Sequence, residues 1–185
     1  MTDSASERLT AAAMRLFQER GLSRVGINEI VREAEVARMS LYNNFRSKGD
    51  LALAAYAALS EARQKAVDAT ISASPDARAA VLAIFDLAQE LAGAPAFRGC
   101  TFLDLAAHSG PDDAPLLALV RHHKAALRDR FTRLALESGL HDADLLGRQL
   151  LALWDGALSD AFIEGDVAPI AAARAAAARL LGPSA

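Results

Sequence analysis

The sequence predicts an all-α protein. Three observations support this prediction: alanine fills 43 of 185 positions, valine and isoleucine are sparse, and helix caps and helix breakers recur along the whole chain. Alanine has the best intrinsic helix propensity, whereas β-branched residues favour strands. We therefore expect nine helices and no strand.

Residues 1–48 predict three short helices. The first runs from about Ser6 to Arg20, where apolar residues recur at helical spacing until Gly21 ends the helix. The second spans about Ile27 to Ala34, with Gly26 or Asn28 at its cap. The third spans about Arg38 to Asn44.

Caps and breakers predict six more helices. Ser47 caps a long fourth helix, with Asp50 three residues on. Ser74, Pro75 and Asp76 begin a fifth, with proline at its first position and an acid in its first turn, and residues 93–95 end it. A sixth ends near residue 108, and a seventh begins at the turn of residues 110–113 and ends near 138. An eighth begins at a cap on Asp142 or His141 and ends at 165, and a ninth covers about 167–181.

Composition narrows the cellular setting. Cys100 is the sole cysteine, so no disulfide can form within the chain, which fits a reducing compartment. No apolar run approaches the ~20 residues of a transmembrane helix, and the N-terminus has no basic segment followed by an apolar one. We expect a cytoplasmic protein with no membrane partner.

Charge is distributed unevenly along the chain. The formal net charge is −3, but residues 1–48 hold eight Lys and Arg against six Asp and Glu, while the rest holds twelve against seventeen. A basic head on an acidic body is the asymmetry expected if only the head meets a polyanion. The natural boundary lies at the start of the fourth helix, between residues 1–48 and residues 49–185.

The second and third predicted helices form a helix-turn-helix. Each has about two turns, and Glu35, Val36 and Ala37 join them, with Val36 as the apolar wedge. The second helix of such a motif enters the major groove of DNA. The predicted third helix has polar residues for the groove, and Leu41 with Phe45 for the inner face.

Residues 9–51 resemble the DNA-binding domain of the tetracycline-repressor (TetR) family of bacterial transcriptional regulators. The matching segments are AAAMRLFQERG, INEI and LYNNFRSKGDL. The resemblance implies a nine-helix architecture, with a helix-turn-helix domain over residues 1–48 and an effector-binding and dimerisation domain over 49–185. It also implies a ligand-responsive regulator, expected to be a repressor, that binds double-stranded operator DNA as a homodimer and is released by a small-molecule effector.

The resemblance also implies roles for seven residues. Those that meet or lie beside base edges are Arg38, Met39, Asn43 and Asn28, and those that contact phosphates are Ser40, Tyr42 and Lys48. Arginine matches guanine and asparagine matches adenine in the major groove. Each of three residues also has an alternative interpretation. Tyr42 could pack on the first helix, Lys48 could be only a solvated residue at a helix start, and Arg38 could bind phosphate in place of a base.

The sequence departs from the family pattern in the turn, at the cap of the second helix and at the end of the third helix. Glu35 replaces the usual glycine, and a positive φ there would cost about 1 kcal/mol. Val25 and Gly26 stand where a hydroxyl residue often caps the second helix, and Asn44 replaces a common histidine.

The body predicts a ligand pocket and a dimer interface. The aromatic and polar candidates for the effector pocket are Phe97, Phe102, His108, His123 and Trp154. Ordinary core packing is the alternative for each. The predicted eighth helix is apolar over more than one face, so it needs cover on two sides. We expect the eighth and ninth helices to pair with those of a second copy, with Gly156, Ala157 and Ala161 in the contact.

Enzyme chemistry finds no support in the sequence. Ser, His and Asp are scattered without motif spacing, so we expect no enzyme, no cofactor and no metal. Asp104 and His108 share a helix face but have no third ligand at suitable spacing. Cys100 is either a redox sensor activated by Arg98 or a buried, inert thiol. Two rival functions stay open: a helical binding or catalytic protein whose head no longer reads DNA, and a DNA-binding regulator without an effector.

Overall fold

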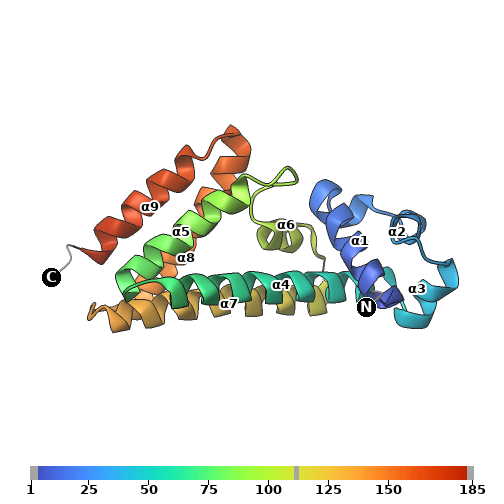
Figure 1. Ribbon diagram of the computed structural model, residues 1–185, viewed down its shortest axis with the longest axis horizontal. Helices are drawn as coiled ribbons and strands as arrows, with labels where there is room; N and C mark the ends of the chain where they lie inside the picture. The colour runs from blue at the N-terminus through green and yellow to red at the C-terminus, as the bar shows by residue number, and fades with distance from the viewer. Residues whose placement is uncertain (1–3, 111–112, 183–185) are drawn as a thin grey trace. The chain divides into compact units, whose positions relative to one another are not determined.

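The computed structural model describes residues 4–110 and 113–182. Over these residues the chain forms nine α-helices, one short 3-10 helix and no strand (Figure 1). The prediction of an all-α fold with nine helices is therefore confirmed. The chain divides into two compact units, one of residues 1–62 with 101–120 and the other of residues 63–100 with 121–185.

The observed helices begin and end within a few residues of the predicted positions. Their bounds are α1 Ala5–Arg20, α2 Ile27–Glu33, α3 Arg38–Asn44, α4 Lys48–Ala73, α5 Ala77–Ala92, α6 Thr101–His108, α7 Ala114–Glu137, α8 Ala143–Glu164 and α9 Ala168–Leu181. The 3-10 helix η1, Leu22–Arg24, was not predicted. The predicted turn before α7 includes residues 111 and 112, which lie outside the described residues.

Side-chain caps explain where several helices begin. Ser4 and Glu7 form a reciprocal capping box at α1, which the predicted start at Ser6 missed. The Ser47 hydroxyl accepts a 3.0 Å bond from the Asp50 amide, as predicted. At α5 the cap is Asp76, whose carboxylate accepts a 2.8 Å bond from the Ala79 amide, so the prediction that Pro75 is the first helical residue was wrong.

The first unit has its core where α1 packs against α2 and α3. Its largest buried side chains are Leu9, Phe17, Ile30, Leu41, Leu51, Tyr56 and Leu105. Phe17 stacks on Tyr56 with ring centroids 6.0 Å apart, and Phe102 meets the same tyrosine edge-on at 6.4 Å. These contacts fix α1 against the first turns of α4, which hold the helix-turn-helix in place.

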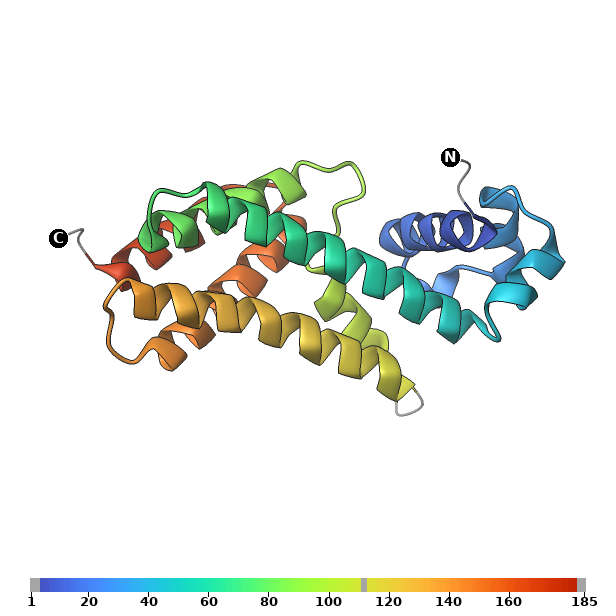
Figure 2. The ribbon, with the colours of Figure 1, turned by 60° about the horizontal axis from the view of Figure 1, so that its bottom comes forward.

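The second unit is built around α8, which packs along α9 and α5 (Figures 1 and 2). Phe85 of α5 lies at its centre, 6.1 Å from the rings of both Phe131 and Trp154. Arg174 of α9 binds Asp86 of α5 at 2.6 Å. Among the described helices, none is long and apolar enough to cross a membrane.

Candidate nucleic-acid interface

The turn between α2 and α3 has the backbone that a tight helix-turn-helix requires. Glu35 adopts φ +52°, a left-handed conformation that favours glycine. The Glu35 and Val36 amides donate back to carbonyls of α2, at 3.2 and 3.3 Å. The family pattern has glycine at this position, and the structure shows that Glu35 adopts the positive φ that glycine would favour.

The two sides of α3 are sharply different. Leu41 is fully buried against the first unit, whereas Met39 is 67% exposed and Tyr42 is 44% exposed. Arg38 and Asn43 are also exposed, and Ser40 is half-buried. This short helix therefore presents the predicted reading residues outward on a rigid, anchored scaffold.

Arg38 and Tyr42 form a pair along the outer face of α3. The guanidinium carbon lies 5.8 Å from the centre of the phenol ring, and Nη2 of Arg38 lies 3.5 Å from the tyrosine oxygen. Such cation–π contacts are worth about 0.5–1 kcal/mol at exposed sites. The exposed phenol argues against the alternative in which Tyr42 packs on α1.

Lys48 is held in a way that the sequence did not predict. Its ammonium group donates a 2.7 Å hydrogen bond to the Leu22 carbonyl of η1, and the side chain is half-buried. Burial lowers the pKa of Lys48. This lysine therefore connects the start of α4 to η1, whose first residue, Leu22, provides the accepting carbonyl.

Asn28 lies in the first turn of α2 and is exposed. Gly26 occupies the N-cap position of this helix, which receives no side-chain cap bond. Of the two predicted caps, glycine is the one that the structure shows. The Asn28 amide is thus not committed to the helix.

Ion pairs leave positive charge uncompensated on this unit. Arg15 pairs with Glu33, and Arg20 pairs with Glu29. The hydrogen bond from Arg20 lowers the pKa of Glu29. Within residues 4–110 and 113–182, no ion pair forms at the exposed Arg24, Arg38 or Arg46. Cations without carboxylate partners are available for phosphates.

The five predicted pocket residues are divided between the two units. Phe102 packs on Tyr56 in the first unit, and the Trp154 ring meets Phe85 in the second. Phe97 meets Phe162 edge-on at 6.4 Å. Phe102 and Trp154 are buried, which agrees with the core alternative for these two residues, whereas Phe97 is half-buried and its partner Phe162 is exposed.

The two predicted histidines differ in exposure. The His108 side chain is 64% exposed and its Nδ1 lies 2.9 Å from the Asp104 carbonyl of the same helix. His123 is largely covered, and burial, followed by the charges of Lys124 and Arg63, lowers its pKa to about 4. His123 is therefore neutral near pH 7, whereas His108 is exposed to solvent.

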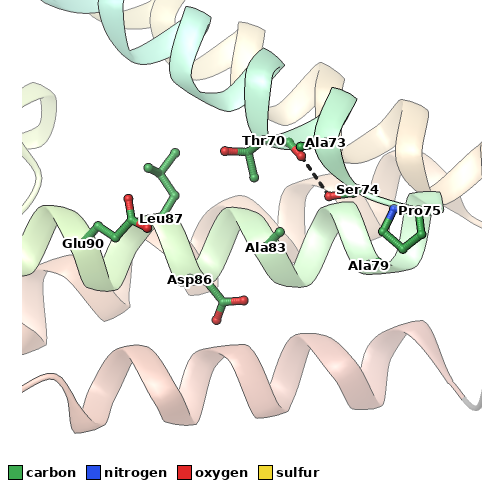
Figure 3. A pocket seen from close by; sticks show the side chains of 9 residues that line it. All are labelled: Thr70, Ala73, Ser74, Pro75, Ala79, Ala83, Asp86, Leu87 and Glu90. Atoms are coloured by element: carbon green, nitrogen blue, oxygen red, sulfur yellow. Dashed lines mark hydrogen bonds between the residues drawn. The ribbon is translucent and has the colours of Figure 1, made fainter.

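The second unit has a surface groove of about 390 Å³ between the end of α4 and α5 (Figure 3). Its lining residues include Thr70, Ser74, Asp86 and Glu90, and none of the predicted pocket residues. A second groove of about 420 Å³ lies along α1 and the end of α2, with Arg8 and Glu33 in its lining. Both grooves are open and have charged residues in their lining, unlike the enclosed, mostly apolar sites typical of small ligands.

The predicted dimer residues lie on two sides of α8. Ala157 and Ala161 are 5% and 4% exposed within the single chain, so they already belong to its own core. Gly156 is exposed, and a methyl group placed there would have no atom within 4 Å. On α8, the face of Gly156 is therefore accessible to a second copy, whereas Ala157 and Ala161 are covered within the single chain.

Known proteins are similar to this chain both in the helix-turn-helix segment and over nearly the whole chain. Residues 9–55 match the family model of the bacterial regulatory proteins, tetR family. The transcriptional regulator AcuR of Cereibacter sphaeroides is 30% identical over 169 residues, which cover 86% of this chain and 77% of AcuR. SCO4454, a TetR-family transcriptional regulator from Streptomyces coelicolor, superposes with a TM-score of 0.89 at 31% identity, covering 96% of this chain and 94% of that one. SAV143, a TetR-type transcriptional regulator of Streptomyces avermitilis, gives 0.77 at 30% identity, with coverages of 95% and 98%. With the helix-turn-helix and its exposed face, these similarities show that the chain belongs to the TetR family of DNA-binding transcriptional regulators.

Proposed function

We propose that the protein is a ligand-responsive repressor that binds a pseudo-palindromic operator as a homodimer and is released by a small-molecule effector. The observation that carries the proposal is the exposed face of α3. A helix anchored by Leu41 and covered outside by Arg38, Met39, Tyr42 and Asn43 fits a major groove.

Three residues of α3 are proposed to read bases. The Arg38 fork fits the O6 and N7 acceptors of guanine, and the Asn43 amide fits adenine. Met39 is 67% exposed and has no donor, so it would contact a thymine methyl group. Such base contacts specify the sequence, whereas phosphate contacts set the register.

Phosphate contacts are proposed for Ser40, Tyr42 and Lys48, with Asn28 beside the groove. Lys48 lies at the first residue of α4, where the helix terminus itself favours anions. Its bond to Leu22 uses one of three ammonium hydrogens, so two remain to donate to a phosphate. Arg24 and Arg46 are exposed and would add to the attraction of the duplex.

The dimer is proposed to form through α8 and α9. On α8, the exposed residues Leu145, Gln149, Ala152, Gly156 and Ile163 recur at spacings of three, four or seven, which is the pattern of a helix-pairing face. Leu145 is 56% exposed and Ile163 is 76% exposed. Large exposed apolar side chains gathered on one face indicate an interaction surface. Two-fold symmetry would then place the two α3 helices in successive major grooves, about 34–36 Å apart.

The effector is proposed to act through a change in dimer geometry. α4 is the natural transmitter, since it begins next to the helix-turn-helix and continues into the body. A coupling of only about 1–3 kcal/mol would change operator affinity by roughly 5- to 150-fold.

Selection of bound duplexes from a random library tests the operator proposal. Wild-type protein should select a palindrome, and Arg38→Ala should lose preference at one base pair per half-site, at a cost of about 1–3 kcal/mol there. Asn44→Ala is a matched control on the same helix, because the Asn44 amide is committed to the Ser40 carbonyl at 2.7 Å. The proposal would be refuted if wild-type protein enriched no duplex sequence, or if Arg38→Ala selected the same base preferences as wild type.

Light scattering after size exclusion tests the dimer. Ile163→Asp should shift the wild-type dimer toward monomer by placing a charge in the contact. Leu136→Asp on α7 is the control, since that leucine is also exposed, at 62%, but lies on another helix. A monomeric wild type contradicts the proposal, and so does an unshifted Ile163→Asp variant.

A further inference from the structure

Arg38 and Tyr42 lie on the same outer side of α3, one helical turn apart. Residues four positions apart on a helix are neighbours, and long side chains lean back toward the helix N-terminus. The Tyr42 ring therefore lies beside the side chain of Arg38, with the guanidinium carbon 5.8 Å from the ring centre. Nη2 of Arg38 lies 3.5 Å from the phenol oxygen, so the arginine contacts both the ring and the hydroxyl group.

Tyr42 is the one polar anchor of the Arg38 guanidinium. In the part of the chain that the structure describes, this guanidinium forms no ion pair and no hydrogen bond other than the one to Tyr42. An exposed arginine otherwise samples many rotamers, and binding a base removes that freedom at an entropic cost. Tyrosine is stiffer, with two side-chain torsions. A contact with Tyr42 therefore restricts Arg38 before DNA is bound.

The pair keeps enough hydrogen-bond donors for DNA. A guanidinium carries five N–H donors, and the contact with Tyr42 engages one of them. A two-pronged contact to the O6 and N7 acceptors of guanine needs two. The Tyr42 oxygen accepts from Arg38, so its own proton stays available for a phosphate oxygen. One arginine and one tyrosine can thus connect a base edge to the neighbouring backbone.

We infer that Tyr42 is a positioning residue for base readout, which holds Arg38 in the rotamer that reaches a guanine. This role is additional to the proposed phosphate contact, and it rests on the proposed function, in which Arg38 reads a base. A phosphate contact carries no sequence information by itself. The ring of Tyr42 therefore determines selectivity through Arg38, and its hydroxyl group contributes affinity for all duplexes.

Two variants separate the ring from the hydroxyl group. Tyr42→Phe keeps the ring and removes the hydroxyl, whereas Tyr42→Leu removes both and leaves a good helix former. Tyr42 is 44% exposed, so both variants should fold, which circular dichroism checks. Asn44→Ala is the matched control on the same helix, because the Asn44 amide donates to the Ser40 carbonyl and not to Arg38.

Competition binding tests the role with the operator that wild-type protein selects and a duplex in which the Arg38 base pair is replaced. A two-pronged arginine contact should give wild type roughly 5- to 150-fold discrimination per half-site. Tyr42→Leu should lower this discrimination about two- to fivefold, the fold-change that corresponds to an exposed cation–π contact. Tyr42→Phe should keep the discrimination and bind both duplexes more weakly by the same factor. Asn44→Ala should match wild type on both duplexes.

A double-mutant cycle shows whether the effect of Tyr42 passes through Arg38. In the Arg38→Ala background, Tyr42→Leu should leave the remaining discrimination at this base pair unchanged. A further loss there would overturn the positioning role. The role would also be overturned if Tyr42→Leu and Tyr42→Phe both weakened the two duplexes equally, since that is the behaviour of a phosphate contact alone.

Nitrogen-15 relaxation of the Arg38 Nε–H group, measured on the free protein at mildly acidic pH, tests the pairing without DNA. The Nε order parameter should be higher in wild type and Tyr42→Phe than in Tyr42→Leu. Equal order parameters in all three would overturn the positioning role even where the operator is bound. A wild type that selects no duplex would instead refute the proposed function, and the readout role with it.

Discussion

Gly147 of α8 is expected to be indispensable for packing against α7, while Gly156 of the same helix is not. A methyl group at Gly147 would lie 2.1 Å from Thr132 Oγ1, 3.0 Å from the Thr132 nitrogen and 3.1 Å from the Arg128 carbonyl oxygen. At Gly156 the same methyl group would have no atom within 4 Å. The two Gly→Ala variants therefore differ in packing but not in chemistry.

The matched pair isolates the packing cost. Gly→Ala within a helix gains roughly 1 kcal/mol of helix propensity, and this gain is common to both variants. Overpacking costs about 1–3 kcal/mol, and the upper part of that range applies to Gly147, because two of the three close atoms are backbone and cannot rotate away. We expect Gly147→Ala to be about 2–3 kcal/mol less stable than Gly156→Ala.

Urea unfolding followed by circular dichroism measures this difference, which corresponds to roughly 5–10 °C in Tm for a chain of this size. Both variants should be compared at two protein concentrations, because an effect on association depends on concentration, whereas overpacking within the chain does not. Equal stability of the two variants would refute the reasoning, since it would mean that α7 and α8 separate without cost.

Three further predictions concern single residues. Lys48→Ala should lower the free energy of unfolding by about 1.5–3 kcal/mol, because the charged hydrogen bond to the Leu22 carbonyl is removed. It should also reduce the salt slope of DNA binding by about 0.9 for each phosphate that the lysine neutralises. Urea titration measures the first effect and DNA binding at several salt concentrations the second, and an unchanged slope would exclude the phosphate contact. The folded-state pKa of His123 is lowered to about 4, so the unfolded chain takes up the proton first as the pH falls below about 6.5. Wild-type protein should therefore lose about 2 kcal/mol of stability between pH 7.5 and pH 5, and His123→Gln should lose less; equal losses would contradict the burial argument. Glu35→Gly should raise the unfolding free energy by up to about 1 kcal/mol, because φ is +52° there, while Glu35→Val should lower it; thermal melts of both variants decide the point.

Local sequence patterns predicted the helices well because the forces that begin and end a helix are local. Apolar spacing defined α1, and Ser47 was recognised as the cap of α4 from the acid three residues on. The errors were also local. Ser74 was taken as the cap of α5, but Asp76 is the residue whose carboxylate reaches the amide three positions on. η1 was missed because a three-residue 3-10 turn has too few residues to show a period.

The outer face of α3 was predictable for a related reason. A two-turn helix with one buried anchor leaves its other sides exposed, so the position of Leu41 implies that Met39 and Tyr42, which lie on other sides of the helix, are accessible. Lys48 was not predictable in the same way. Its bond to the Leu22 carbonyl depends on a turn 26 residues earlier, whose conformation the pattern did not reveal.

Long-range contacts explain why the body resisted prediction. The apolar pattern of α8 showed that two of its faces need cover, but the pattern does not show which face is covered within the same chain. In the structure α8 packs against α5 and α9, and Ala157 and Ala161 are buried while Gly156 is exposed. The same holds for the thiol. Sequence proximity suggested Arg98 as the partner of Cys100, yet the Arg98 guanidinium lies 5.4 Å above the Phe162 ring. The cation at the sulfur is Lys124 of α7, which lies 24 residues further along the chain. The chemistry of a buried cysteine is therefore set by which helices pack around it, so even a complete account of the local sequence leaves its reactivity undetermined.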